Sequence, residues 1–94
     1  MKPTAVLINT SRGEVIDEAA LVAALQERRI AGAGLDVFSK EPIDAANPLL
    51  KLDNVVVYPH SAGTTIDTWQ RRLDFAFGNM RRSLAGESLM GLVK

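Results

Sequence analysis

The sequence predicts an α/β fold with a partial parallel sheet of about three strands, one crossover helix and a long C-terminal helix. Three short, mostly apolar runs carry this prediction, at residues 5–8, 31–37 and 55–58. A helical pattern follows the first run, and a longer one follows the third. This alternation is typical of parallel α/β units, in which ligands gather beyond the carboxyl ends of the strands.

The first half of the chain predicts a strand, a helix and a second strand. Residues 5–8, Ala-Val-Leu-Ile, are apolar at every position, which favours a strand buried on both faces. A helix is expected from about Glu18 to Arg28, because Asp17 is a good N-cap and Glu18 suits the positive end of the helix dipole. The second strand is expected in residues 31–37, where small residues allow a close approach by another backbone or helix.

The second half predicts a loop, a strand and a long helix. Residues 38–54 contain Pro42 and Pro48 among scattered apolar residues, so we expect a loop with room for one helical turn. The third strand, 55–58, stops at Pro59. An amphipathic helix should begin at Thr64 or Thr65, in a segment that resembles a capping box, and end at Gly86. Its apolar positions are Ile66, Trp69, Leu73, Ala76 or Phe77, Met80 and Leu84.

The composition is that of one small globular domain. The 94 residues are 47% hydrophobic and 23% charged, and eleven acidic residues balance eleven basic ones. This balance argues against a nucleic-acid or membrane partner. The absence of cysteine excludes disulfides and Cys-based metal sites, and a single histidine excludes a multi-histidine metal site. With neither a signal-like segment nor a membrane-spanning run, we expect a cytoplasmic protein.

Three polar side chains follow the three predicted strands: Arg12, Glu41 and His60. A guanidinium can hold a carboxylate through two parallel hydrogen bonds, and an imidazole can move a proton near neutral pH. A carboxylate can orient that imidazole and stabilise its charge. Each residue taken alone is more readily interpreted as an ordinary loop or surface residue. Together they predict a site for an anionic carbonyl or alcohol substrate.

Asp36 interrupts a run that is otherwise suited to burial. Such an acidic side chain is costly to bury unless it is paired or lies at the open end of a strand. Two interpretations stay open: Asp36 caps a neighbouring backbone, or it contacts a ligand. Common cofactor and hydrolase motifs are absent, since the G-x-G of Gly32 and Gly34 continues into a strand, and no P-loop, G-x-S-x-G or H-E-x-x-H is present.

With these motifs in this order, the chain resembles the C-terminal part of the nicotinamide-binding domain of D-isomer-specific 2-hydroxyacid dehydrogenases. The resemblance implies a Rossmann-like fold and covers nearly the whole chain. It is carried by residues 7–13 (LINTSRG), 17–25, 31–38 (AGAGLDVF), Glu41-Pro42, Pro48-Leu49 and 54–60. Formate-oxidising relatives have Gln at the position of Glu41, so Glu41 argues against that branch of the family.

The resemblance implies an NAD(P)-dependent oxidoreductase acting on a 2-keto or 2-hydroxy acid. Arg12 would bind the substrate carboxylate and carbonyl oxygen, His60 would donate a proton to that oxygen, and Glu41 would hydrogen-bond His60. Asp36 would meet the nicotinamide carboxamide. The rest of the ring site would be lined by Thr10, Arg12 and the turn His60, Ser61, Ala62 and Gly63.

By the same resemblance, residues 1–94 would form the C-terminal half of the dinucleotide-binding domain, without the glycine-rich half and without the substrate domain. NAD or NADP binding by this chain alone would then be weak or absent, and its activity low. We also expect a homodimer that covers the first strand or the long helix around Trp69 and Leu73. Two alternatives stay open: a non-catalytic module that self-associates or binds a partner, and a regulatory homologue in which the three polar residues persist.

Overall fold

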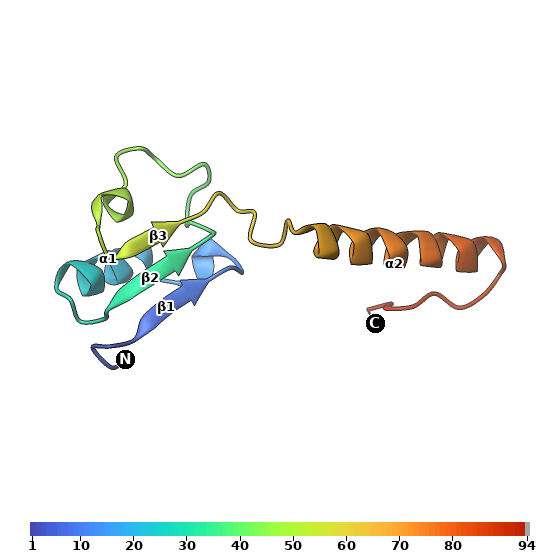
Figure 1. Ribbon diagram of the computed structural model, residues 1–94, viewed down its shortest axis with the longest axis horizontal. Helices are drawn as coiled ribbons and strands as arrows, with labels where there is room; N and C mark the ends of the chain where they lie inside the picture. The colour runs from blue at the N-terminus through green and yellow to red at the C-terminus, as the bar shows by residue number, and fades with distance from the viewer. Residues whose placement is uncertain (94) are drawn as a thin grey trace. The chain divides into compact units, whose positions relative to one another are not determined.

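The computed structural model describes residues 1–93, which form a small α/β unit followed by a long helix (Figure 1). The chain divides into two compact units, Met1–Ala62 and Gly63–Lys94. The elements of the first unit are β1 (Val6–Asn9), a 3₁₀ turn (Gly13–Val15), α1 (Glu18–Gln26), β2 (Gly32–Leu35), a second 3₁₀ turn (Pro48–Lys51) and β3 (Val55–Val57). The second unit contains α2 (Ile66–Leu84). The predicted α/β class, with its three strands, crossover helix and long C-terminal helix, is confirmed.

The three strands form one parallel sheet in the order β1-β2-β3. Leu35 is the register partner of both Asn9 and Val57, which are the last residues of β1 and β3. The three strands therefore end level with one another. Because parallel strands end at the same edge of a sheet, the segments that follow them start side by side. This common edge is where the candidate site lies.

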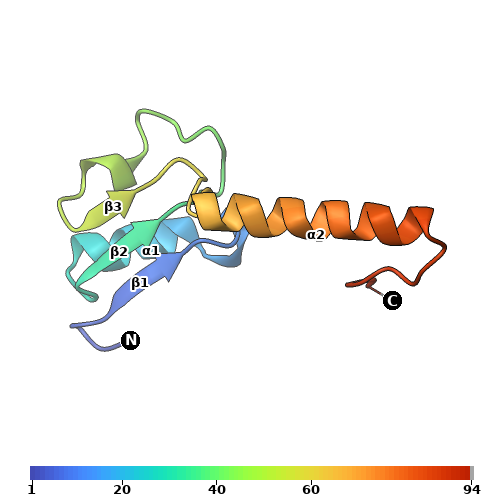
Figure 2. The same ribbon diagram turned by 45° about the vertical axis from the view of Figure 1, so that its right-hand side comes forward.

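Helix α1 begins at Glu18 as the sequence predicts and covers one face of the sheet. It ends at Gln26, two residues before the predicted end at Arg28, whose φ of 54° is outside the helical range. The Asp17 carboxylate accepts a hydrogen bond from the Ala20 backbone N–H at 3.0 Å, which caps the first turn. Leu21 and Leu25 of α1 are buried against the sheet, and Figures 1 and 2 show α1 packed on one of its faces. The buried hydrophobic residues are Leu21, Leu25, Ile30, Ala33, Leu35, Val37, Phe38 and Leu49.

The prediction that the first strand is buried on both faces is wrong for the described residues. Val6 is 59% exposed and Ile8 is 74% exposed, whereas the next residue, Asn9, is buried. Successive side chains of a strand point to opposite faces, and α1 covers only the face of Leu7 and Asn9. Val56 of β3 is exposed in the same way. The uniformly apolar run therefore reflects a strand with one open apolar face.

Helix α2 follows its predicted bounds closely. The Thr65 hydroxyl accepts a hydrogen bond from the Thr68 N–H at 3.2 Å, so Thr65 is the N-cap. The helix ends at Leu84, and Gly86 follows with a φ of 71°, the left-handed conformation in which glycine commonly ends helices. Within residues 1–93 there is no helix whose length and apolar character would let it cross a bilayer.

Candidate active site

Asn9, the last residue of β1, shapes the turn that carries Thr10 and Arg12. Its side-chain oxygen accepts hydrogen bonds from the Ser11 N–H at 3.0 Å and the Ser11 hydroxyl at 2.9 Å. Its side-chain NH₂ donates to the Arg12 carbonyl at 2.8 Å. Asn9 is buried, and these bonds satisfy both ends of its amide. This role was not predicted from the sequence, although an Asn directly after an apolar run is a signal for a turn closed by its side chain.

Asp36, directly after β2, fixes the turn that carries His60. One carboxylate oxygen accepts the Ser61 N–H at 2.8 Å and the other accepts the Ala62 N–H at 2.9 Å. Asp36 is only 5% exposed, and its own backbone carbonyl accepts the His60 N–H at 2.8 Å. These bonds match the first of the two interpretations of Asp36, in which it caps a backbone segment. The segment that it caps lies 25 to 26 residues further along the chain.

His60 has a left-handed backbone with a φ of 48°. A left-handed residue other than glycine is uncommon, and it persists where surrounding contacts hold it. Here the His60 N–H is anchored on Asp36, and the next two amides are held by the Asp36 carboxylate. The turn therefore aims the imidazole from a fixed backbone.

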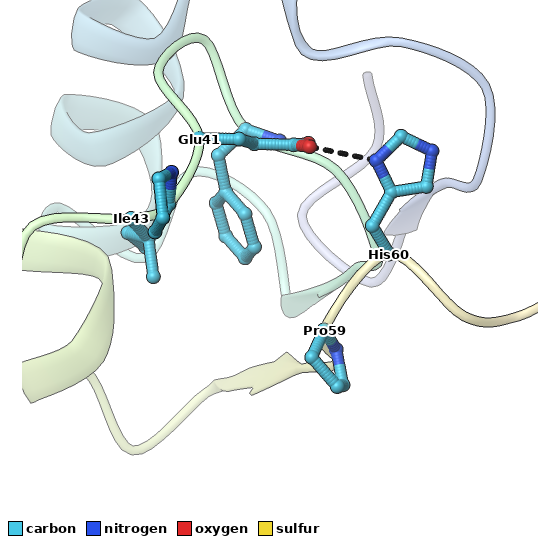
Figure 3. A pocket seen from close by; sticks show the side chains of 6 residues that line it. Glu41, Ile43, Pro59 and His60 are labelled. Carbon is cyan, nitrogen blue, oxygen red and sulfur yellow. Dashed lines mark hydrogen bonds and ion pairs between the residues drawn. The ribbon is translucent and has the colours of Figure 1, made fainter.

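Glu41 and His60 are in direct contact. Glu41 Oε2 lies 2.7 Å from His60 Nδ1, and Figure 3 shows the carboxylate facing the imidazole. The second carboxylate oxygen accepts the Phe38 backbone N–H at 3.0 Å. An ionised carboxylate can only accept hydrogen bonds, so Nδ1 must carry the proton in this pair. The other ring nitrogen, Nε2, points away from Glu41 and is the atom that could exchange a proton with a ligand (Figure 3).

The surroundings of Glu41 favour its charged form. The hydrogen bond with His60 and then the one from the Phe38 N–H lower the pKa of the Glu41 carboxyl below its ordinary value of 4.5, against a smaller effect of burial. The positive charges of His60 and Arg12 lower this pKa further. Arg12 thus acts on Glu41 through its charge, while one of its guanidinium NH groups donates to the Ser11 carbonyl at 2.6 Å. Glu41 is therefore ionised at neutral pH and offers a charged acceptor to His60 Nδ1.

A pocket of about 430 Å³ opens beside the Glu41–His60 pair. Its apolar wall is formed by Phe38, Pro42, Ile43 and Pro59, and Glu41 and His60 supply the polar groups (Figure 3). A mostly apolar pocket with a few converging polar groups is the usual form of a small-molecule site. The pocket can therefore hold a small ligand against the acid-base pair.

The structure brings most of the candidate residues to the carboxyl edge of the sheet. Thr10 and Arg12 follow β1, Asp36 follows β2, and His60 follows β3. Glu41 reaches the same edge from the irregular segment after β2. Ala62 belongs to the turn held by Asp36. Gly63 begins the second compact unit, and its place in the site stays a prediction.

Comparison of the sequence with known proteins identifies the family of this chain. Residues 1–62 match the family model described as the NAD binding domain of D-isomer specific 2-hydroxyacid dehydrogenase. The chain belongs to this family. The 2-hydroxyacid dehydrogenase resemblance read from the sequence is therefore confirmed.

Individual dehydrogenases and reductases agree with this membership. Glyoxylate reductase from Thermofilum pendens is 53% identical over 93 residues, which are 99% of this chain and 27% of that protein. A D-isomer specific 2-hydroxyacid dehydrogenase from Xanthobacter autotrophicus Py2, solved with NADPH and MES, has a TM-score of 0.83 and 42% identity, over 100% of this chain and 38% of that one. D-lactate dehydrogenase from Lactobacillus jensenii, solved with NAD⁺, has a TM-score of 0.86 and 33% identity, over 100% of this chain and 32% of that one.

The chain spans about a quarter of the length of the curated relatives that it matches, 27% in the case of the Thermofilum pendens reductase. The stretch shared with the 2-hydroxyacid dehydrogenases contains Arg12, Glu41 and His60, and it includes all three strands of the sheet.

Proposed function

We propose that this chain supplies the acid-base and substrate-binding part of an NAD(P)-dependent 2-hydroxyacid oxidoreductase. The observation that carries the proposal is the 2.7 Å contact between Glu41 and His60, beside a pocket, in a chain of this dehydrogenase family. Arg12 adds a positive charge near Glu41 and a fork of donors suited to a carboxylate. This set of groups fits the reduction of a 2-keto acid and its reverse.

In the direction of reduction, the Arg12 guanidinium binds the carboxylate and the keto oxygen of the substrate. His60 Nε2 donates a proton to the keto oxygen, so the C=O group becomes CH–OH when the carbon accepts a hydride. Reduced nicotinamide, when bound, supplies that hydride. His60 leaves the step as a neutral ring with its remaining proton on Nδ1, hydrogen-bonded to Glu41. Ionised Glu41 thus keeps His60 oriented, with the Nδ1 proton directed at the carboxylate.

The polar groups at the carboxyl edge fit the nicotinamide end of a dinucleotide. We assign Thr10, Arg12, Asp36 and His60 to this end, with Ala62 and Gly63 of the following turn. Each Asp36 oxygen accepts one backbone N–H and retains capacity for a second donor, such as a carboxamide NH₂. NAD and NADP are both candidates, because one solved relative holds NADPH and another holds NAD⁺.

The test measures oxidation of NADH and of NADPH with a panel of 2-keto acids that includes glyoxylate. The chain is assayed alone and together with a polypeptide that carries the remaining part of the Thermofilum pendens reductase. We expect turnover in the combined assay, its loss in Arg12→Ala and in His60→Asn, and little change in Arg71→Ala on α2. Because the sequence has no glycine-rich turn for the pyrophosphate, we expect weak or no cofactor binding by the 94 residues alone. Equal turnover in the wild type and in the Arg12 and His60 variants would contradict the proposed function.

A second candidate function is self-association through α2. None of the residues of this helix is buried, and Trp69 is 52% exposed. One side of the helix carries a stripe of large apolar residues: Ile66, Trp69, Leu73, Phe77, Met80 and Leu84. Such a stripe in water calls for a partner surface. The partner that we propose is a second copy of α2 in antiparallel orientation, which sets Asp67 in the first turn of one copy near Arg81 and Arg82 in the last turn of the other.

Sedimentation at micromolar concentration tests this candidate. We expect a dimer for the wild type and a monomer for Leu73→Glu, which puts a charge within the apolar stripe. Arg71→Glu places the same acidic side chain on the opposite side of α2 and should leave the dimer intact. A monomeric wild type would rule out the homodimer, while leaving the proposed chemistry of Glu41 and His60 untouched.

A further inference from the structure

The segment that carries Glu41 lacks regular secondary structure, yet it must hold the carboxylate opposite His60. Between Leu35 at the end of β2 and Pro48 the chain has neither helix nor strand, and most of residues 39–47 are exposed. Exposed irregular segments are ordinarily mobile unless they are tied down. We propose that Glu18, the first residue of α1, is a positioning residue that fastens this segment and so fixes Glu41 against His60. The importance of this positioning for catalysis rests on the proposed function.

One carboxylate joins the two ends of the segment. Glu18 Oε2 accepts the Ser39 backbone N–H at 3.0 Å and the Ser39 hydroxyl at 2.7 Å. Glu18 Oε1 accepts the Asn47 side-chain NH₂ at 2.8 Å. Asn47 in turn caps the following 3₁₀ turn, because its side-chain oxygen accepts the Leu49 N–H at 2.9 Å, and Leu49 is fully buried. Glu18 therefore ties both ends of residues 39–47 to the helix that covers the sheet.

The peptide between Phe38 and Ser39 is held from two sides. Its N–H donates to Glu18, and its carbonyl lies so close to Gly13 that a Cβ on Gly13 would be 1.9 Å from the Phe38 oxygen. The preceding N–H, that of Phe38, donates to Glu41 Oε1. Two consecutive backbone N–H groups thus bind two different carboxylates. A shift of the Ser39 amide away from Glu18 would also move the Phe38 donor that orients Glu41.

Glu18 is suited to this role at neutral pH. Burial raises the pKa of the Glu18 carboxyl, but the hydrogen bonds from Ser39 and Asn47 together lower it by more, so it titrates below 4.5. The ionised carboxylate has acceptor capacity for all three donors, whereas the amide of a glutamine has only one oxygen. From the sequence, Glu18 was predicted only to suit the helix dipole, because its hydrogen-bond partners lie 21 and 29 residues away along the chain.

The test follows Glu41 and His60 by NMR in the 94-residue chain. The Glu41 side-chain ¹³C signal reports the pKa of its carboxyl, and the ring ¹⁵N signals of the single histidine report which nitrogen carries the proton. In Glu18→Gln and Glu18→Ala we expect the Glu41 pKa to rise most of the way to 4.5 and the preference for a proton on Nδ1 to weaken. Ser39→Ala should cause a smaller shift in the same direction, because its backbone N–H still reaches Glu18.

Two control variants separate positioning from general destabilisation. Glu27→Gln removes one acidic charge from the end of α1, where Glu27 pairs with Arg29, and should leave both signals unchanged. Asp17→Ala removes the helix cap without touching residues 39–47, so it should lower stability and leave the Glu41 pKa in place. If Glu18→Gln leaves Glu41 and His60 as in the wild type, or if Asp17→Ala shifts them equally, the positioning role is wrong.

An activity arm distinguishes this inference from the proposed function. In the combined assay, Glu18→Gln should lower kcat by about tenfold, part of what a general acid contributes, and change KM little, because Arg12 is left in place. Absence of turnover in the wild type would overturn the proposed function, and the NMR comparison would still decide the role of Glu18. A wild-type kcat in Glu18→Gln would show that positioning by Glu18 does not contribute to catalysis.

Discussion

Replacing Gly13 with alanine should damage both stability and the site. A Cβ at this position would lie 1.9 Å from the Phe38 oxygen, 2.0 Å from the Phe38 carbon and 2.5 Å from the Ser39 nitrogen. All three atoms are backbone, so no side-chain rotation can relieve the clash, and the turn must retreat by about 1.5 Å from residues 38–39 to reach an ordinary contact of 3.4 Å. Overpacking of this kind costs about 1–3 kcal/mol of the free energy of unfolding.

Urea unfolding followed by circular dichroism measures this cost. The matched control is Gly34→Ala in β2, where the new Cβ would lie 3.8 Å from Ile8 Cγ1, an ordinary van der Waals distance. We expect Gly34→Ala to stay within about 0.5 kcal/mol of the wild type. Gly13→Ala should also weaken the Glu41–His60 contact, because it displaces the peptide next to the Phe38 donor. If both variants unfold at the wild-type midpoint, the close packing of the Arg12 turn against Phe38 is not a constraint on this protein.

Three further predictions concern the charge and packing around the site. Because the pKa of Glu41 is lower in the folded state than its ordinary value of 4.5, its contribution to stability should be present above pH 4.5. This contribution should be lost as the pH falls through the lower folded-state pKa. In Glu41→Gln, the free energy of unfolding should therefore depend less on pH in this range. Asp36→Asn should cost about 1–3 kcal/mol in urea unfolding, because one of the two amides held by Asp36 would face an NH₂ group, and Asp36→Glu should not restore the bonds. Leu49→Ala should cost about 2–5 kcal/mol, since this side chain is 1% exposed; Leu50→Ala, its more exposed neighbour, should cost far less.

The fold was largely predictable because its determinants are local. Asp17 and Thr65 cap the helices next to which they stand, Gly86 follows the end of α2, and the helical turn in the 38–54 loop begins at Pro48. Such signals act within a few residues of the positions that they specify. The 3₁₀ turn at Gly13–Val15 was not predicted, because it carries no periodic pattern of its own.

The open face of β1 could not be predicted from composition. An apolar run at residues 5–8 looks the same whether both faces are covered or one is, since the difference lies in what packs above it. The parallel sheet itself was correctly predicted, and its level strand ends follow from the pairing of Leu35 with Asn9 and with Val57. Register of this kind depends on contacts between distant segments, for which a single sequence gives no direct sign.

The candidate site was predictable in part. The places of Arg12, Glu41 and His60 after strands indicated one shared edge, and their order gave the family resemblance. The residues that hold the site segments in place, Glu18 and Asn9, were not predicted, because the sequence around them indicates only an ordinary helix start and an ordinary turn. Asp36 was left with two interpretations for a related reason: its partners are backbone amides of a turn 25 to 26 residues away.

The left-handed backbone of His60 restricts which residue can serve at this position. Side chains that titrate near neutral pH are few, and residues that accept a positive φ without large strain are also few, with Asn, Asp and His prominent among them. Histidine meets both conditions. Alanine at position 60 would therefore combine loss of the proposed proton donor with a backbone penalty of roughly 1–2 kcal/mol, whereas asparagine removes the imidazole and keeps the chain geometry. The backbone shape of this turn thus narrows the residues that suit position 60, and it makes asparagine the informative replacement for histidine.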